Sequence, residues 1–85
     1  MVKWGEFFSL KGGQSSWFAW VVASEFAPGQ LVVKPESIPS DFQILRRATT
    51  KTDDKSERIL FGHHIEVRNN LRHTCSFRLG LVTFK

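Results

Sequence analysis

The chain has 85 residues, enough for one domain with a modest core. Hydrophobic residues make up 41% of it, which excludes a disordered segment, and its single cysteine excludes an internal disulfide. No run approaches the roughly 20 apolar residues of a membrane span. We therefore expect a single soluble domain over residues 1–85, in the cytoplasm or elsewhere inside the cell, with no membrane partner.

The net charge of +4 is unevenly distributed along the chain. Residues 1–45 carry three Lys against four acidic residues, whereas residues 46–85 carry nine Lys and Arg against four acidic residues. A basic half of this kind can attract nucleic acid, anionic lipid or an acidic protein face. It is more often the solvated surface that keeps a small domain in solution.

Alternation of apolar and polar residues dominates the chain and favours an all-β fold. Turn-forming residues such as Lys-Gly-Gly and Ala-Pro-Gly separate the alternating runs. The predicted strands are 4–10, 16–23, 30–34, 42–46, 58–67 and 72–79, with a short terminal strand at 81–84. We expect a small antiparallel sandwich or barrel of six to seven strands, rich in hairpins. The run RRATTKTDDKSER at 46–58 mixes both charges with almost no apolar residue, and it predicts a flexible loop.

The turn at 11–13 predicts a first hairpin between strands 4–10 and 16–23. One face of this hairpin is apolar and is expected to face the core: Trp4, Phe8, Leu10, Phe18, Trp20 and Val22. The opposite face then places Phe7 opposite Trp17, with Val21 alongside. Large aromatic side chains facing away from a core are typical of interfaces. Phe7, Trp17 and Val21 are therefore the predicted partner-binding residues; the alternative is that a second layer, such as the segment 30–45, covers this face.

The stretch LFGHHIEVRNNLRHTCSFRL at 60–79 holds all three histidines and the only cysteine. A hairpin with a three-residue loop at 68–70 puts His63 opposite Cys75 and Glu66 opposite Arg72. This register is favoured because it places the apolar side chains on one face: Phe61, Ile65, Val67, Leu71, Cys75 and Phe77. His64 then points to the other face.

Three residues of that hairpin, His63, His73 and Cys75, are left as candidate metal ligands. Structural zinc normally requires four close ligands, so we expect no metal and no cofactor, and histidines that pack at the rim of a core. A nucleophile pair of Cys75 and His63 is a further alternative, but no oxyanion-stabilising group accompanies it in the sequence. We expect a protein without enzymatic activity.

The pattern Phe61-Gly62-His63-x-Ile65-x-Val67-Arg68, after Ile59-Leu60, resembles a repeat of the β-trefoil domains at the amino end of ryanodine and inositol trisphosphate receptors, which are related to the MIR domain. An aromatic-Gly step followed by alternating hydrophobic residues carries the likeness, and Trp4-Gly5 repeats it loosely. A trefoil has three such repeats, and fewer than two fit here. The resemblance implies a non-catalytic, barrel-like β domain, either an incomplete trefoil or one completed by association.

The leading hypothesis is an interaction module that binds a protein partner, or itself as a homo-oligomer, through the Phe7 and Trp17 face. The alternative is single-stranded nucleic-acid binding through the basic C-terminal half, with the surface residues Arg46, Arg47, Arg58, Arg68, Arg72 and Arg78. Carbohydrate binding by an exposed Trp is a further alternative.

Overall fold

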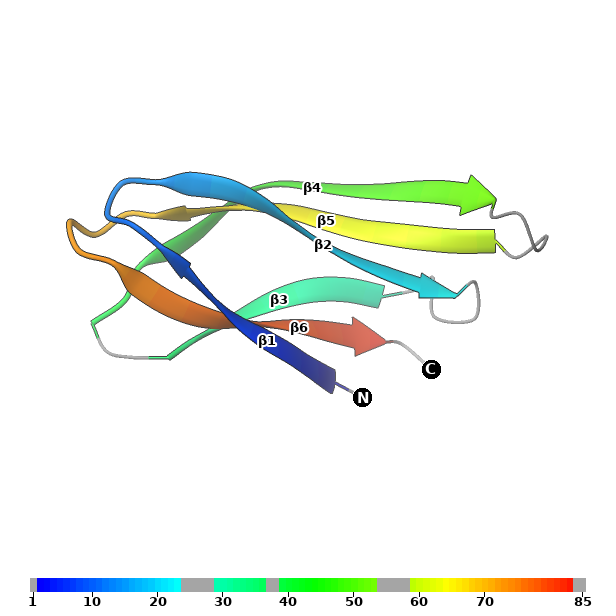
Figure 1. Cartoon of the computed structure of the whole chain (residues 1–85), viewed down its shortest axis with the longest axis horizontal. Coiled ribbons are helices and arrows are strands. Elements are labelled where there is room, and N and C mark those ends of the chain that lie inside the picture. The colour runs from blue at the N-terminus through cyan, green and yellow to red at the C-terminus, as the bar shows by residue number, and fades with distance from the viewer. Residues whose placement is uncertain (1, 24–28, 37–38, 54–58, 84–85) are drawn as a thin grey trace.

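The computed structural model describes residues 2–23, 29–36, 39–53 and 59–83. Over these residues the chain forms antiparallel strands and no helix, and hence no helix that could cross a membrane. The six strands found there are β1 (Val2–Leu10), β2 (Ser15–Ala23), β3 (Gly29–Pro35), β4 (Phe42–Asp53), β5 (Ile59–Asn69) and β6 (Cys75–Thr83) (Figure 1).

The strands form two three-stranded sheets that lie face to face (Figure 1). The strand order is β1-β6-β3 in one sheet and β2-β5-β4 in the other. The molecule is elongated along the strands, with extents of 45 × 23 × 18 Å. The prediction of a small all-β antiparallel sandwich is therefore confirmed.

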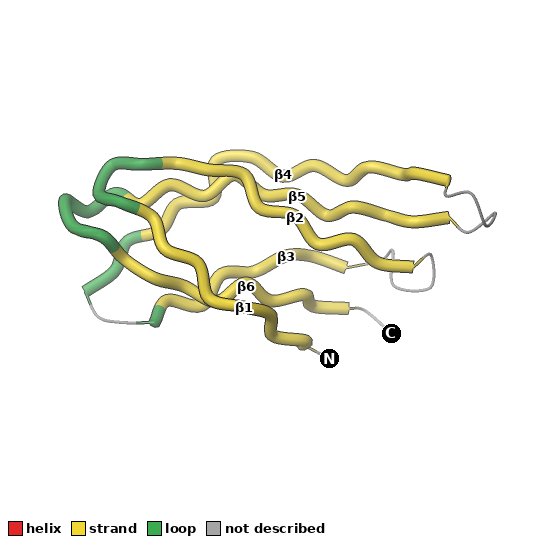
Figure 2. The backbone as a smooth tube through the Cα atoms, in the orientation of Figure 1, coloured by secondary structure: helices red, strands yellow, loops and turns green. Residues whose placement is uncertain are grey.

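The connections β1–β2 and β5–β6 each carry the chain from one sheet to the other, and both lie at the same end of the molecule (Figure 2). Both predicted hairpin pairings are therefore wrong. β1 pairs with β6, and β2 pairs with β5. A short connection can join two strands that face each other in different sheets as well as two neighbours in one sheet. Both arrangements bury the same apolar side chains. The pattern of buried residues therefore did not distinguish a hairpin from a connection between the sheets.

The β1–β2 connection, residues 11–14, contains two glycines. Gly13 has a positive φ of 76°, which a residue without a Cβ adopts at no steric cost. Gly12 lies so close to the backbone of Arg72 that a Cβ would collide with it. The Gly13 N–H donates to the Asn69 carbonyl at 2.9 Å, and the Asn69 N–H donates to the Gln14 carbonyl at 2.9 Å. The β1–β2 connection is thus tied to the end of β5.

The side chain of Asn69 is fully buried and fastens the other connection. Its Nδ2 group donates to the Leu10 carbonyl at 3.0 Å and to the His73 carbonyl at 2.8 Å. Its Oδ1 atom accepts the Leu71 N–H at 3.0 Å. One amide therefore satisfies backbone groups from the end of β1 and from the β5–β6 connection.

The core lies between the sheets, where β5 and β6 face each other across the centre. Its buried hydrophobic residues are Leu10, Leu31, Ile65, Val67, Cys75, Phe77, Leu79 and Leu81. Phe77 is central, because its ring lies 5.0 Å from Phe18, 5.1 Å from Phe42 and 6.0 Å from Phe8, centroid to centroid. The predicted inward orientation of Ile65 and Val67 is confirmed.

A bulge in β1 changes which face its first residues occupy. The register of β1 against β6 shifts between Trp4 and Phe7, so these two residues lie opposite Gly80 and Arg78. Phe8 faces the core as predicted, but the prediction that Trp4 faces inward is wrong. The Trp4 ring lies across Gly80, where a Cβ would be 2.5 Å from Trp4 Cζ3.

Two strand boundaries differ from the sequence prediction. Residues 46–53, predicted as part of a flexible loop, continue β4 along β5, and the rest of that prediction, 54–58, lies outside the described residues. Residues 46–53 of β4 are held by their pairing with β5. They therefore form a strand without the apolar alternation on which the sequence prediction of strands depended. The segments 72–79 and 81–84 are not separate strands, because β6 runs through Gly80 from Cys75 to Thr83.

Candidate functional site

The predicted aromatic face made of Phe7 and Trp17 does not exist as one surface. Phe7 lies opposite Arg78 on the outside of sheet β1-β6-β3, and Trp17 lies opposite Glu66 on the outside of sheet β2-β5-β4. The two rings are therefore on opposite sides of the sandwich. Each is exposed, with Phe7 at 52%, Trp17 at 47% and Val21, on the same face as Trp17, at 59%.

The outer face of sheet β1-β6-β3 gathers aromatic, aliphatic and cationic side chains. We call it the Trp4/Phe7 face, and it comprises Val2, Trp4 and Phe7 of β1, Val32 and Lys34 of β3, and Arg78 and Val82 of β6. The β1 bulge creates it, because the bulge turns Trp4 to the same side as Phe7. Val2, Trp4 and Phe7 are all exposed.

Cations lie over both rings of this face. The Lys34 Nζ atom is 5.5 Å from the centroid of the Trp4 ring. The Arg78 Cζ atom is 4.4 Å from the centroid of the Phe7 ring, a distance at which a guanidinium is attracted to the ring face. Arg78 Nε is buried and has no hydrogen-bond partner among the described residues. Phe7, Lys34, Pro35, Glu36 and Arg78 line a hollow of about 130 Å³.

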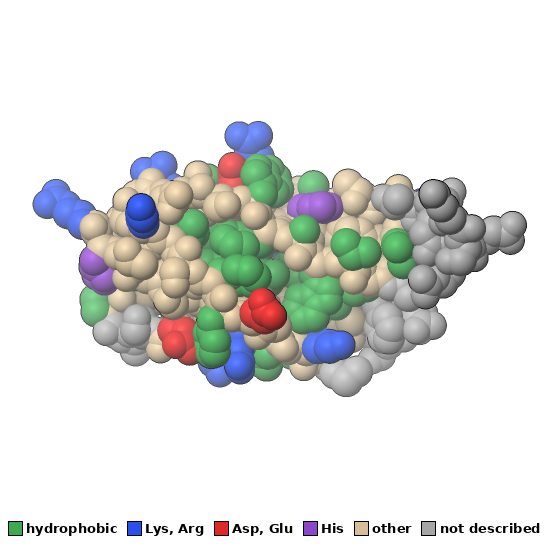
Figure 3. Space-filling model, in the orientation of Figure 1, with side chains coloured by type: hydrophobic (Ala, Val, Ile, Leu, Met, Phe, Trp, Pro, Cys, Tyr) green, Lys and Arg blue, Asp and Glu red, His purple; other side chains and the backbone are tan. Residues whose placement is uncertain are grey.

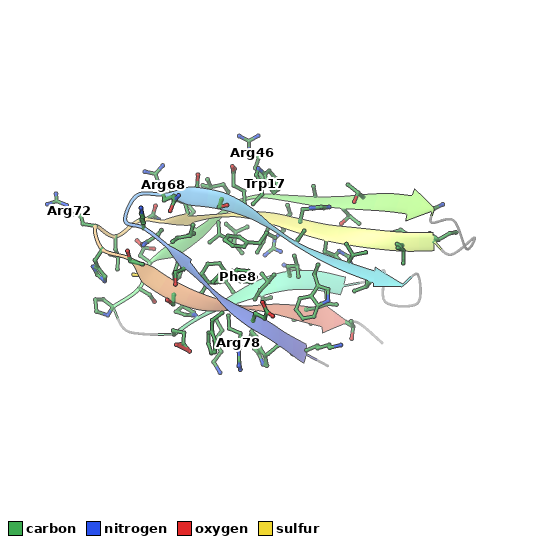
Figure 4. All side chains as sticks on the ribbon, viewed as in Figure 1. Phe8, Trp17, Arg46, Arg68, Arg72 and Arg78 are labelled. Carbon is green, nitrogen blue, oxygen red and sulfur yellow. The ribbon has the colours of Figure 1, made fainter. Side chains whose placement is uncertain are left out.

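The opposite face, on sheet β2-β5-β4, is organised by polar pairs next to β2. Trp17 shares a row with Glu66 and Arg46, and the Arg46 Nε atom lies 3.3 Å from the Glu66 carboxylate. The predicted pairing of Glu66 with Arg72 is therefore wrong. In the next rows Thr50 Oγ1 and His64 Nε2 share a hydrogen bond of 3.0 Å. Figure 4 shows Trp17 and Arg46 on one side of the molecule and Arg78 on the other.

The predicted basic residues do not form one surface. Besides Arg46 and Arg78, Arg47 donates from Nη1 to the Leu31 carbonyl at 2.6 Å and so joins β4 to the edge of β3. Arg68 and Arg72 are exposed near the end of the sandwich that holds the β5–β6 connection (Figure 4). Arg58 lies outside the described residues.

The candidate metal ligands are also separated. His63 is buried on β5, His73 is exposed in the β5–β6 connection, and Cys75 is buried on β6. β5 and β6 belong to different sheets, so the prediction that His63 lies opposite Cys75 is wrong. In the part of the chain that the structure describes, no group of His, Cys, Asp and Glu is arranged to hold a metal ion. His64 points outward, as predicted.

Sequence reasoning placed Phe7 on an exposed face but missed Trp4 and Lys34. A signal for Trp4 was present, because a glycine within a strand often marks a bulge, and Gly5 follows Trp4 directly. No such local signal exists for Lys34. It reaches this face through the pairing of β3 with β6, a long-range contact.

These observations define a small antiparallel β-sandwich whose Trp4/Phe7 face carries exposed aromatic side chains with cations over their rings. Comparison of the chain with protein-family models, with curated proteins and with solved structures finds no match in any of the three.

Proposed function

We propose that this protein is a non-enzymatic interaction module that binds a protein partner through the Trp4/Phe7 face. The observation that carries the proposal is the contiguity of exposed Val2, Trp4 and Phe7 on one sheet surface, next to Arg78. Trp and Arg are enriched among the residues that dominate binding energy at protein interfaces. A rigid sheet presents them without a large loss of side-chain freedom on binding.

The charges on this face favour a partner with acidic residues around an apolar patch. Lys34 and Arg78 lie over the rings and are within reach of a bound surface, while Glu36 lies at the border of the hollow. A partner carboxylate beside the Arg78 guanidinium, which lies over the Phe7 ring, would form a charge-assisted hydrogen bond with it. Among the described residues, Arg46 and Arg47 lie on other surfaces, which favours a protein over a nucleic-acid backbone.

The double variant Trp4→Ala/Phe7→Ala is expected to lose partner binding while keeping the fold. Truncating an interface anchor costs about 2 kcal/mol or more, so the two changes together should raise Kd by at least about 100-fold. The wild-type chain is first used as bait to capture its binding partner. The captured protein is then purified and titrated calorimetrically against the wild type and the variant to measure both Kd values.

The matched control is Leu45→Ala, which truncates an exposed apolar side chain on β4, away from the Trp4/Phe7 face. It should leave Kd unchanged. A partner that binds the double variant as tightly as wild type would show that this face is not the binding site. The proposal would also be overturned if no captured protein binds the wild-type chain more tightly than the double variant.

Single-stranded nucleic-acid binding is the second candidate, because a cation lies beside each ring of the Trp4/Phe7 face. Bases stack on exposed aromatic side chains while Lys and Arg hold the phosphates. If this candidate is right, the Kd for a short oligonucleotide should rise steeply with salt, and Trp4→Ala should weaken binding at every salt concentration. A fluorescence-anisotropy titration measures this, and a flat salt response or no binding at low salt would exclude it.

A further inference from the structure

Among the described strands, four lie at sheet edges: β1 and β3 in one sheet, β2 and β4 in the other. An edge strand presents unpaired backbone groups to any other strand, and proteins usually block such edges with bulges, charges or proline. β1 has a bulge and carries Lys3 and Glu6. β3 ends in Lys34 and Pro35. These two edges are therefore protected in the ordinary way.

The β3 and β4 edges are protected further. Arg47 covers the outer edge of β3 by donating to the Leu31 carbonyl. β4 has its own bulge between Ile44 and Arg46, and it carries Arg46, Arg47 and Lys51. Both devices discourage the approach of another strand.

β2 has none of these features. Its sequence, SSWFAWVVA, contains no charged residue and no proline. Its register against β5 is unbroken from Ser15 to Ala23. Its outward-facing side chains, Trp17, Ala19 and Val21, are all exposed. Among the four edges it alone is long, regular and uncharged, the combination that pairs with another strand.

The free backbone groups of β2 belong to those outward-facing residues. The Asn69 N–H bonds the Gln14 carbonyl, and bonded pairs then recur at every second residue of an antiparallel ladder. Ser16, Phe18 and Trp20 therefore exchange hydrogen bonds with β5. The N–H and C=O groups of Trp17, Ala19 and Val21 point away from β5, toward the open edge.

We infer that β2 pairs antiparallel with β2 of a second copy of this chain. Ala19 is the middle residue of the strand, so a two-fold axis at Ala19 gives the longest overlap. Ala19 then bonds Ala19 of the second copy, and Trp17 bonds Val21 of the second copy. The sheet β2-β5-β4 becomes one continuous six-stranded sheet across the dimer.

Both faces of the new junction are complementary. On the outer face Trp17 packs against Val21 of the second copy, an aromatic and β-branched pair that stabilises neighbouring strands. On the inner face Phe18 lies beside Trp20 of the second copy. Figure 3 shows hydrophobic side chains gathered at the centre of the face where β1 and β2 meet. Phe8, Ala19 and Trp20 line a cavity of about 220 Å³ there, which the second strand would border.

Charge favours a second copy over a different chain. Pairing about a two-fold axis at Ala19 brings the residues next to the axis close to their own equivalents, so a charge there would be repelled by an identical charge. β2 contains none. The middle residue of β1, in contrast, is Glu6, which would face its own equivalent in such a pairing.

The first test compares Ala19→Lys with Ala48→Lys. The two alanines are exposed on the same outer face and in the same row, on either side of His64, but Ala48 is on β4. Sedimentation equilibrium over a concentration series should show a wild-type dimer. Ala19→Lys should weaken it by at least about tenfold through repulsion at the two-fold axis, and Ala48→Lys should leave it unchanged. A wild-type monomer at all concentrations, or equal effects of the two variants, would overturn the inference.

The second test does not depend on weakening the fold. In the two-fold pairing the Cα atoms of position 19 are about 5.5 Å apart, a separation that a disulfide can span. Mild oxidation should therefore convert Ala19→Cys, but not Ala48→Cys, into a covalent dimer; the native Cys75 is buried. Failure of Ala19→Cys to cross-link faster than Ala48→Cys would count against the pairing. Since Ala19 is on the outer face of the other sheet, its substitution leaves the side chains of the Trp4/Phe7 face unchanged, and partner binding there is measured separately.

Discussion

Replacing Phe77 by Ala is expected to lower the free energy of unfolding by about 3–5 kcal/mol. Phe77 is fully buried between the sheets, and its ring contacts those of Phe8, Phe18 and Phe42. These rings come from β1, β2 and β4, so the truncation opens a cavity where both sheets meet. A domain of this length has a total stability of about 4–13 kcal/mol, so much of it would be lost.

Urea unfolding followed by circular dichroism measures this effect. The matched control is Phe7→Ala, because Phe7 is also on β1-β6-β3 but its ring lies on the outside of the sheet. That change should cost no more than about 1 kcal/mol, the loss of one exposed ring and its contact with Arg78. Equal losses for the two variants would mean that the core is not centred on Phe77.

The variant Asn69→Asp is expected to lose at least about 3 kcal/mol, although the side chain hardly changes size. In the wild type, Nδ2 donates to the carbonyls of Leu10 and His73. A carboxylate cannot donate, so it would leave both carbonyls without a partner and place a buried negative charge beside them. Protonation returns one donor, so the deficit relative to wild type should shrink as the pH falls.

Asn70→Asp provides the comparison, since Asn70 is the next residue and is exposed. Its Nδ2 group makes only a long contact of 3.4 Å with Gln43 Oε1. Thermal unfolding of the two variants at neutral and acidic pH should show a large, pH-dependent loss for Asn69→Asp and little change for Asn70→Asp. Similar melting temperatures for both variants would show that Asn69 does not fasten the two connections.

The all-β class and the inward residues were predictable because alternation is a local property. Ile65 and Val67 face the core whichever strand lies beside β5, since successive side chains of a strand point to opposite faces. Strand pairing was not predictable in the same way. Lys11-Gly12-Gly13 is suited to a hairpin turn, yet here it leads from one sheet to the other, and the reason is its long-range contact with Asn69 and Arg72.

The candidate site was predicted only in part, for the same physical reason. Alternation left open whether Phe7, Trp17 and Val21 are exposed or covered by a second layer, and all three are exposed. The prediction that Phe7 and Trp17 share one face depended on the hairpin pairing and is wrong. The face that replaces it brings Phe7 together with Trp4, Lys34 and Arg78, and it depends on a bulge and on three strands distant in sequence.

The strand order also has a consequence for how the molecule folds. Among the described strands only β4 and β5 are neighbours both in the chain and in a sheet. β1 pairs with β6, so that Val2 lies opposite Val82 at the far end of the sequence. Chains dominated by such distant contacts fold slowly, because a large loop must close before the contacts form. During synthesis β1 has no partner strand until β6 has been made, and its apolar side chains stay accessible to chaperones for all of that time.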